Sequence, residues 1–526
     1  MTDGRELSTA ALRTTRSWSG RILLIVFGVG IGIASSVAVV DSPSDFRTVA
    51  ADADAFAAAG PEVVGDESVA EGGPAVGNRK AGPSGGPAAA GPNGAATAEG
   101  PLGGDVPIAN PEQYKCEEGE NGGSTDKGVT GNSIKVAANV VQDGVGASFL
   151  KEAKIGIEAV FDEVNVEGIC GRKIILTTRN DKWDAATGME YIRNYIADGV
   201  FALAVNPSSE GLDLATQTRV IANEGIPVVG SDGMLISQYR LMKDGQDLAS
   251  WIWPITPSTI TTMHVIAQQG IEAKAATFGL VWDEKYKFGT EGREAFVEHL
   301  KRLGVPTNKI YDQKITPGRE QYTQEANTFN NGCDAMGGCD LVAMLLDSST
   351  AVTWIKANAD FGELVTSGPQ TLFNDAFATN CEAERKKLPG GKHCDLIVWT
   401  GYNPPVGGLA NLPDVSEYVS AVKARDGQAD TSNSFTQGAY LGARVFVEAL
   451  KEVGPNLTRA NLKRVLDNFT YSSDLVNPGR PLRWTAGNHF ANVTMHAFRV
   501  GYTPDQGFTG WAPETEWYTD SHIGQV

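Results

Sequence analysis

The sequence predicts an α/β protein made of two doubly wound parallel-sheet lobes joined by a hinge. Short apolar segments alternate with longer segments of helical character, as buried strands alternate with helices in parallel sheets. The alternation begins again after Pro254. In addition, the chain from 116 to 526 is longer than the roughly 250–300 residues that one hydrophobic core usually serves. Together these observations predict two lobes rather than one.

The first run of the alternation lies between about 130 and 254. Short runs of apolar and β-branched residues favour strands there, and helical spacing of apolar residues favours the segments between them as helices. The expected strands are 134–140, 173–178, 200–205 and 227–230, and the expected helices are 148–164, 186–198 and 209–224.

The second run lies between about 255 and 395, and the tail after it has too few strands for a third lobe. We therefore expect the chain to cross between the lobes more than once. Lobe 1 would comprise about 130–254 plus 400–480, and lobe 2 about 255–395 plus 481–510. The expected strands are 276–282, 309–315, 340–346, 370–374, 396–400, 483–485 and 492–500, and the expected helices are 258–269, 289–303, 319–330, 349–359, 414–425, 435–452 and 458–469.

An uncharged apolar segment at 22–40 predicts a transmembrane signal anchor. Its length matches the roughly 20 residues that cross a bilayer as a helix. Arginines precede it and acids follow it, which predicts that 1–21 is a cytoplasmic tail and that the head is extracytoplasmic, on a single-pass protein of the cell membrane. A cleaved signal peptide is the alternative, because Ser36-Val37-Ala38 resembles a small-residue cleavage site.

Residues 41–115 are rich in Ala, Gly and Pro, most densely between Ala81 and Gly104. Nothing in this segment has the apolar period needed to build a core, so we expect a disordered tether. The head then comprises 116–526.

The net charge of −19 argues against nucleic acid or anionic lipid as a partner of the head, because both require a basic surface. A small-molecule ligand is favoured instead, and no cofactor is expected. The histidines are scattered, with no pair at zinc-ligand spacing, so no metal site is expected either.

The six cysteines all lie in the head, and an even number in an oxidising compartment favours disulfides. Six cysteines allow 15 connectivities. Among these we expect local pairs of Cys333 with Cys339 and of Cys381 with Cys394, which leaves Cys116 with Cys170.

Candidate ligand-binding residues follow the expected strands, because parallel sheets bind ligands at the carboxyl ends of their strands. After 200–205 come Ser208 and Ser209, whose hydroxyls suit a ligand carboxylate, although serine is also a common helix cap. After 227–230 come Ser231 and Asp232, where Asp232 is alternatively a turn residue.

Further candidates follow the strands of the second run. Tyr286 and Phe288 could line a cleft or pack against a helix start. Asp347 and Asp375 could each neutralise an ammonium group or cap a helix. Trp183, after 173–178, is expected to be a core aromatic rather than a lid.

The sequence contains no enzyme motif in a suitable context. Gly82-Pro83-Ser84-Gly85-Gly86 fits the nucleophile-elbow pattern, but it lies in the tether with no strand before it or helix after it. A phosphate-binding loop and a His-Glu-x-x-His motif are both absent from the sequence. The sequence therefore favours a binding protein over an enzyme.

Several short motifs, in this order and spacing, resemble the type I periplasmic binding proteins of ABC importers, in the branched-chain amino acid and amide-binding group. The resemblance covers about 130–500. The motifs are Gly128-Val129-Thr130-Gly131-Asn132-Ser133-Ile134-Lys135-Val136, Asn180-Asp181, Pro207-Ser208-Ser209, Ile226-Pro227-Val228 and Lys287-Phe288-Gly289.

The resemblance implies a clamshell receptor that closes on a small solute and delivers it to an ATP-driven permease. It implies that Ser208 and Ser209, with Ser231 beside them, hold a ligand carboxylate. By the same resemblance Asp375 would hold an ammonium group and Phe288 would cover the ligand.

The chain departs from the amino acid binders of this group at two positions. Gly233 stands where those binders have a hydroxyl, and Leu346 stands where they have an aromatic residue. These departures leave the ligand open between an amino acid, an amide, a peptide, a polyamine or a similar solute. A sensing or assembly ectodomain on the same fold, without a transport role, is the alternative function.

Overall fold

The computed structural model describes residues 121–358, 365–388 and 392–519. The predicted cytoplasmic tail, signal anchor and tether, at 1–21, 22–40 and 41–115, lie outside these ranges, as does Cys116. Among the helices that are described, none is long and apolar enough to cross a membrane.

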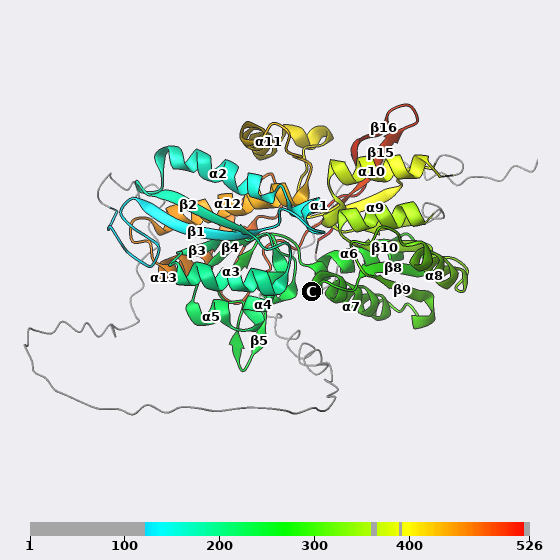
Figure 1. The fold of residues 1–526 in the computed structure, drawn as a ribbon, viewed down its shortest axis with the longest axis horizontal. Helices are drawn as coiled ribbons and strands as arrows, with labels where there is room; N and C mark the ends of the chain where they lie inside the picture. Colours follow the sequence, from blue (N-terminus) through cyan, green and yellow to red (C-terminus); the bar gives the residue numbers. More distant parts are fainter. Residues whose placement is uncertain (1–120, 359–364, 389–391, 520–526) are drawn as a thin grey trace, which may run out of the picture. The chain divides into compact units, whose positions relative to one another are not determined.

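Lobe 1, as we use the name, is the five-stranded parallel sheet in the order β2-β1-β3-β4-β7 with the helices that cover it. Helices α2 and α12 lie on one face of this sheet, and α3, α4 and α5 on the other (Figure 1). The strands are β1 (Ser133–Val140), β2 (Lys173–Asn180), β3 (Ala202–Ala204), β4 (Val228–Ser231) and β7 (Ile252–Pro254). The helices are α1 (Ala147–Leu150), α2 (Ala153–Glu167), α3 (Ala185–Ala197), α4 (Ser209–Gln217), α5 (Val220–Glu224), α11 (Pro413–Arg425), α12 (Ser434–Val453) and α13 (Arg459–Leu466), with the short elements η4 (Ile236–Gln238), β5 (Met242–Lys243), β6 (Gln246–Asp247), β13 (Thr470–Tyr471) and β14 (Leu482–Arg483).

Helix α12 approaches the sheet closely because both contacting residues are glycines. A Cβ atom on Gly442 would lie 2.3 Å from the carbonyl oxygen of Gly230 in β4, and a Cβ atom on Gly230 would lie 2.4 Å from the carbonyl oxygen of Gly442. Gly230 also has a φ of +72°, which glycine adopts without strain. The helix is therefore seated directly on the backbone of the strand.

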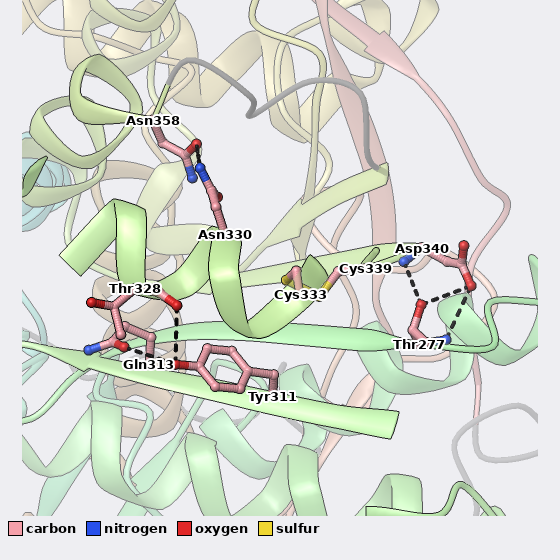
Figure 2. Close-up of a disulfide and its surroundings, with 9 residues drawn as sticks. All are labelled: Thr277, Tyr311, Gln313, Thr328, Asn330, Cys333, Cys339, Asp340 and Asn358. Atoms are coloured by element: carbon pink, nitrogen blue, oxygen red, sulfur yellow. Dashed lines mark hydrogen bonds between the residues drawn. A yellow bond between two sulfur atoms is a disulfide. The ribbon is translucent and has the colours of Figure 1, made fainter. Parts of the chain in front are cut away.

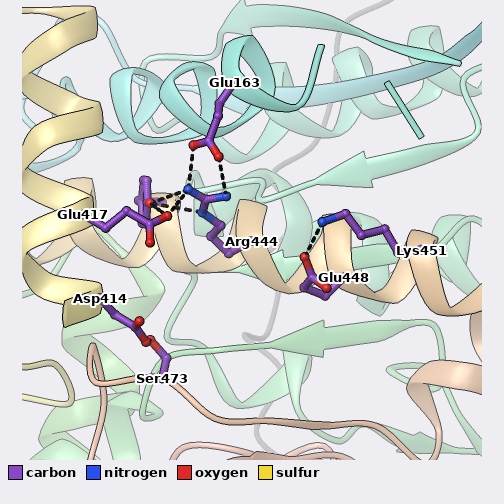
Figure 3. A network of polar contacts seen from close by, with 8 residues as sticks. Glu163, Asp414, Glu417, Arg444, Glu448, Lys451 and Ser473 are labelled. Carbon is purple, nitrogen blue, oxygen red and sulfur yellow. Dashed lines mark hydrogen bonds and ion pairs between the residues drawn. The ribbon is translucent and has the colours of Figure 1, made fainter. Parts of the chain in front are cut away.

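Arg444 of α12 joins this helix to two neighbours. Its guanidinium pairs with Glu163 of α2 at 2.6 Å and also with Glu417 of α11, as Figure 3 shows. It also donates a hydrogen bond of 3.0 Å to the hydroxyl of Tyr440. One cation thus connects the helices on this face of lobe 1.

Lobe 2 is the seven-stranded sheet in the order β16-β15-β12-β11-β10-β8-β9, with its covering helices. The strands from β9 to β12 are parallel, and β15 and β16 are antiparallel at one edge. The strands are β8 (Phe278–Asp283), β9 (Ile310–Ile315), β10 (Leu341–Leu345), β11 (Val365–Gly368), β12 (Leu396–Thr400), β15 (His496–Thr503) and β16 (Gly507–Pro513). The helices are α6 (Thr259–Glu272), α7 (Lys287–Arg302), α8 (Thr323–Asp334), α9 (Ser348–Ala357) and α10 (Asp375–Lys386), with η5 (Thr307–Lys309), η6 (Gln370–Leu372) and η7 (Gly407–Asn411).

Successive residues of β10 face opposite sides of the lobe 2 sheet, as the two-residue period of a strand requires. Leu341, Ala343 and Leu345 belong to the cluster that contains residues of α6 and α7. Val342 and Met344 belong to the cluster that contains residues of α8, α9 and α10. This strand is therefore buried on both faces, and the predicted fold class is confirmed.

The predicted local disulfides are present. Cys333, in α8, is bonded to Cys339 ahead of β10 (Figure 2). Cys381, in α10, is bonded to Cys394 ahead of β12. The pairing of Cys170 with Cys116 stays a prediction, because Cys116 lies outside the described residues.

The segments that pass between the lobes are held side by side. The side-chain amide of Asn492 donates hydrogen bonds to the backbone oxygens of Ile255 and Gly401, each at 3.2 Å. The indole of Trp484 donates to Pro254 at 3.0 Å. Ile255, Gly401 and Asn492 stand in three different segments that cross between the lobes. The Asn492 side chain therefore joins all three segments of the hinge.

Several predicted boundaries are wrong. The strand expected at 370–374 is β11 at Val365–Gly368, followed by the 3-10 turn η6, because Pro369 has no N–H for a ladder and Leu372 bonds back to it. The expected helix 209–224 is two helices, broken at Arg219, whose φ is +64°. Strand β16 was not expected.

We predict that Gly442→Ala lowers the free energy of unfolding by about 1–3 kcal/mol, because the added methyl group would overlap the Gly230 backbone. Chemical denaturation followed by circular dichroism measures this change. Gly427→Ala is the matched control, since its Cβ atom would meet nothing closer than 4.0 Å. Equal stability of the two variants would contradict the packing described for α12.

We also predict that acid destabilises lobe 2 through two stacked, buried histidines, His264 and His299. Burial lowers the pKa of His299 to about 4 and that of His264 to about 2. The unfolded chain therefore binds protons that the folded chain excludes, and the free energy of unfolding should fall by about 5 kcal/mol as the pH drops from about 6.5 to 4. His299→Phe, which keeps the stacked ring, should reduce this fall in acid-denaturation measurements.

Candidate functional site

Two carboxylates, one from each lobe, hold the lobes in contact by accepting hydrogen bonds from the backbone of the opposite lobe. Both contacts lie at the carboxyl ends of the strands. Glu210 of α4, in lobe 1, accepts a hydrogen bond from the backbone N–H of Lys287 in lobe 2 at 3.1 Å. Glu291 of α7, in lobe 2, accepts one from the backbone N–H of Ile236 in lobe 1 at 3.0 Å. The lobes therefore form a closed arrangement.

Each of these carboxylates caps a helical turn that has no cap of its own. Tyr286 precedes α7 and Leu235 precedes η4, and neither side chain bonds the first N–H groups of its helix. Unbonded N–H groups at a helix start are costly when buried, and a carboxylate suits the positive end of the helix dipole. Closure supplies the missing acceptors from the opposite lobe.

Burial changes the protonation of both carboxylates. Loss of water raises the pKa of Glu291 to about 8, against the opposing effect of its bond from Ile236. Loss of water likewise raises the pKa of Glu210 to about 7. In an open arrangement both groups would regain water and titrate near their ordinary value of about 4.3. Closure is therefore coupled to proton uptake.

A third contact joins the lobes at the same edge. Ser148 in α1 donates a hydrogen bond to the carboxylate of Asp347 at 3.3 Å. Asp347 also accepts hydrogen bonds from the N–H groups of Ser349 and Thr350, so it is the cap of α9. Of the two roles predicted for Asp347, the contacts are those of the helix cap.

Aromatic rings fill the space between the lobes. Trp183, from the turn between β2 and α3, stacks on Tyr286 with ring centroids 4.1 Å apart. It meets Phe149 edge to face at 5.2 Å, and its indole N–H donates to the hydroxyl of Ser209 at 3.1 Å. Since Tyr286 belongs to lobe 2, these rings make one apolar cluster that continues across both lobes.

The cavity left beside these rings has a volume of about 20 Å³. That is room for about one water molecule, whereas ligand sites usually enclose roughly 300–1,000 Å³. The lining residues are Phe149, Leu150, Trp183, Pro207, Ser209, Asp232, Gly233, Met234, Leu235, Phe288, Thr371 and Phe435. The side chains of the protein itself thus occupy most of the pocket.

The structure brings some of the predicted site residues together at this pocket. Ser209, Asp232 and Phe288 line it, and Tyr286 adjoins it through Trp183. The backbone turns that carry these residues follow β3, β4 and β8, as the strand-end rule requires.

Ser208 and Ser231 are buried and bonded within lobe 1. The Ser208 hydroxyl donates to Asp181 at 2.9 Å, and the Ser231 hydroxyl donates to Gln238 at 3.3 Å. Neither side chain lines the pocket. Both residues shape the turns that surround it.

Asp232 is fully buried against the hinge. One of its oxygens accepts a hydrogen bond from the Tyr402 hydroxyl at 2.7 Å. Loss of water raises the pKa of Asp232 well above its ordinary value. Burial therefore disfavours the charged form of this residue.

Asp375 does not line the pocket. It stands in the first turn of α10, and its carboxylate accepts hydrogen bonds from Ser432 at 2.6 Å and from Trp511 at 3.0 Å. The expectation that Asp375 directly follows a strand is wrong, because β11 ends at Gly368. Asn374, not Asp375, is the side chain that caps α10.

Phe149, Phe435, Glu210 and Glu291 were not predicted from the sequence as residues of the site. Trp183 is a buried member of the apolar core, as expected, but its place in the pocket lining was missed, although the strand-end rule could have found it. Nothing in the sequence indicated that Glu210 and Glu291 meet the opposite lobe, since that contact depends on how the lobes close.

A larger recess of about 590 Å³ lies on lobe 1. Its charged side chains are largely paired with one another: Ser473 donates to Asp414 at 2.7 Å, and Lys451 pairs with Glu448 at 2.7 Å (Figure 3). It is lined by α12 and the segment 469–475 and lies at no strand end of the parallel sheet. The pocket between the lobes is therefore the better candidate site.

The family comparison decides the broad assignment. A family model described as "Periplasmic binding protein" matches residues 133–507. The chain belongs to this family. Proteins of the family are extracytoplasmic, bind solutes and are not enzymes, so this chain is a solute-binding protein, as the sequence predicted.

Solved structures of solute-binding proteins share the fold. A possible leucine/isoleucine/valine-binding protein from Rhodopirellula baltica SH 1 has a TM-score of 0.58 at 14% identity, covering 70% of this chain and 94% of that one. A fatty acid ABC transporter substrate-binding protein from Thermomonospora curvata has a TM-score of 0.59 at 16% identity, covering 76% and 96%. An ABC transporter solute-binding protein from R. palustris in complex with 4-hydroxybenzoate has a TM-score of 0.58 at 13% identity, covering 74% and 97%. The comparison with curated protein sequences gave no match.

We predict that closure of this solute-binding protein weakens as the pH rises from about 6 to 9. The closed state holds protons on Glu210 and Glu291 that an open state releases, so its advantage is complete at low pH and is lost through the raised pKa values. Small-angle scattering should show a larger radius of gyration at pH 9.

Glu291→Gln, which copies the protonated form, should reduce this pH dependence. Glu294→Gln is the matched control, because Glu294 lies on the same helix and is exposed. A radius of gyration that is independent of pH in the wild type would refute the coupling.

Proposed function

We propose that this chain is a membrane-tethered solute-binding protein that closes on one small ligand and delivers it to an ABC importer. In this proposal 22–40 is the anchor, 41–115 the tether, and lobes at about 130–254 plus 400–480 and 255–395 plus 481–510 form the receptor. The observation that carries the proposal is the pocket between the lobes at the carboxyl ends of both sheets, closed by the Glu210 and Glu291 contacts.

The relatives of known ligand support a carboxylate-bearing solute. Their names refer to branched-chain amino acids, a fatty acid and 4-hydroxybenzoate, and each of these molecules carries a carboxylate. In this chain Ser209, at the start of α4, offers a hydroxyl in the pocket. We propose that Ser209 binds this group and that Phe288 covers the rest of the solute.

The other predicted residues take supporting roles in the proposal. Ser208 and Ser231 hold the turns, Tyr286 backs the aromatic wall, and Asp232 connects the pocket to the hinge through Tyr402. Asp347 and Asp375, which contact Ser148 and Ser432 across the lobes, would stabilise closure rather than touch the solute.

We predict that a thermal-shift screen of amino acids, amides and aromatic or aliphatic carboxylates identifies a solute that stabilises the protein. Binding adds RT ln(1 + [L]/Kd), or about 2.7 kcal/mol at a hundredfold excess over Kd. Ser209→Ala should weaken the binding about tenfold or more, as loss of a hydrogen bond to a charged group does. Calorimetry measures the affinity.

Ser416→Ala is the matched control, because Ser416 is exposed on α11. If no solute shifts the melting curve, and native mass spectrometry of the purified protein also shows none, the proposed function fails. Copurification of the full chain with an ABC permease from detergent-solubilised membranes tests delivery separately.

A further inference from the structure

The turn that carries Trp183 is held in an unusual backbone conformation. Lys182 and Trp183 have φ values of +57° and +61°, a region that costs roughly 1 kcal/mol or more for a residue with a side chain. Such a conformation persists only where the surroundings enforce it.

Asp181 enforces this turn. One of its carboxylate oxygens accepts hydrogen bonds from the Trp183 backbone N–H at 3.0 Å and from the Ser208 hydroxyl at 2.9 Å. The turn after β2 is thereby tied to the turn after β3, whose next residue is Ser209. The strained backbone carries the indole to the pocket, where it joins the apolar cluster that continues across both lobes.

The indole has the contacts of a bound ligand. Its faces and edges meet Tyr286, Phe149 and Phe288, and its single polar atom donates to Ser209. A Cβ atom on Gly146 would lie 3.1 Å from the Trp183 side chain, so a glycine leaves room for it. Only 3% of the Trp183 surface is exposed.

We propose that Trp183 is the residue that determines which solutes enter, because its indole stands in for the solute, and that the solute is a flat aromatic molecule with one polar group facing Ser209. This inference rests on the proposed solute-binding function and narrows its ligand class. To bind, the solute displaces the indole from the space between Phe149 and Tyr286.

The composition of the walls favours an aromatic solute over a zwitterionic amino acid. Apolar side chains form most of the pocket lining, namely Phe149, Leu150, Trp183, Pro207, Met234, Leu235, Phe288 and Phe435. An ammonium and a carboxylate placed together in this pocket would lose water to apolar walls, and each would need several hydrogen bonds in compensation. A flat ring with one polar group needs only the partner that the indole already uses.

Displacement has a consequence for affinity. While the indole fills the pocket, only the fraction of molecules with Trp183 turned out can accept a solute, and the apparent Kd is raised by that fraction. Removing the indole therefore strengthens binding, although it removes an aromatic group from the site. A residue that merely lined the pocket would have the opposite effect.

The test uses indole itself and benzofuran, which has the same shape but no N–H group. In the Trp183→Ala variant, calorimetry should show one indole bound per chain, about fivefold more tightly than benzofuran, because indole restores the hydrogen bond to Ser209. In the double variant with Ser209→Ala, this preference for indole should disappear. Aromatic solutes found in the thermal-shift screen should bind Trp183→Ala about tenfold more tightly than they bind the wild type.

Trp354→Ala is the matched control, since Trp354 is fully buried in lobe 2 and its indole N–H has no partner among the described residues. Indole bound there should show no dependence on Ser209. If Trp183→Ala does not fold, Trp183→Phe, which keeps a ring but loses the bond to Ser209, should still bind the screened solutes more tightly than the wild type.

Two results would overturn the inference: a folded variant that binds indole and benzofuran equally, or a solute whose affinity is unchanged or weakened when Trp183 is replaced. In either case a solute that binds the wild type would leave the proposed function standing. Absence of any bound solute in the wild type and in both Trp183 variants would remove the proposed function as well.

Discussion

The reciprocal hydrogen bonds between a carboxylate of each lobe and the backbone of the other are the constraint on which the closed site depends. Glu210 and Glu291 each complete the first turn of a helix in the opposite lobe, so neither helix start is satisfied unless the lobes are together. Because both acids are buried in the closed arrangement, their desolvation works against the hydrogen bonds that they accept, and the balance shifts with protonation. That balance suits a receptor that must let its solute leave.

The hinge segments are bonded to one another and to the pocket. Asn492 bonds the two other crossing segments at Ile255 and Gly401, and His496 contacts the backbone oxygen of Tyr402 at 2.8 Å. The Tyr402 hydroxyl in turn bonds Asp232 at the pocket. The hinge and the pocket are therefore connected through a few buried polar groups. Among them Asp232 is satisfied only in part, since its second oxygen has no hydrogen-bond partner among the described residues.

The sequence was sufficient for the alternation of strands and helices, because β1 and β10 are short, apolar and buried on both faces, as parallel strands are. It also placed Ser209 and Phe288 at the pocket, since residues after parallel strands share one edge of a sheet. The prediction of strands failed where buried apolar residues do not take part in the hydrogen bonds of a sheet. Leu372 and Phe373 are fully buried and suggested a strand, but Pro369 interrupts the ladder and they lie in and after a 3-10 turn. The sequence did place Trp183 in the apolar core. It gave no sign of the contact that Glu210 makes between the lobes or of the positive φ at Trp183, because both depend on the assembled structure.

The filled pocket and the clamp together hold the lobes in the closed arrangement. An empty apolar cavity between the lobes would forfeit the packing contacts of its walls and would weaken closure. Trp183 supplies those contacts from within the chain, and the positive φ values of Lys182 and Trp183 store part of the resulting energy as backbone strain. A solute that replaces the indole restores the same wall contacts. A molecule that fits the walls less well than the indole gains too little to displace it. A solute therefore competes with the Trp183 side chain, which is always present at high effective concentration. This competition sets the selectivity of the site.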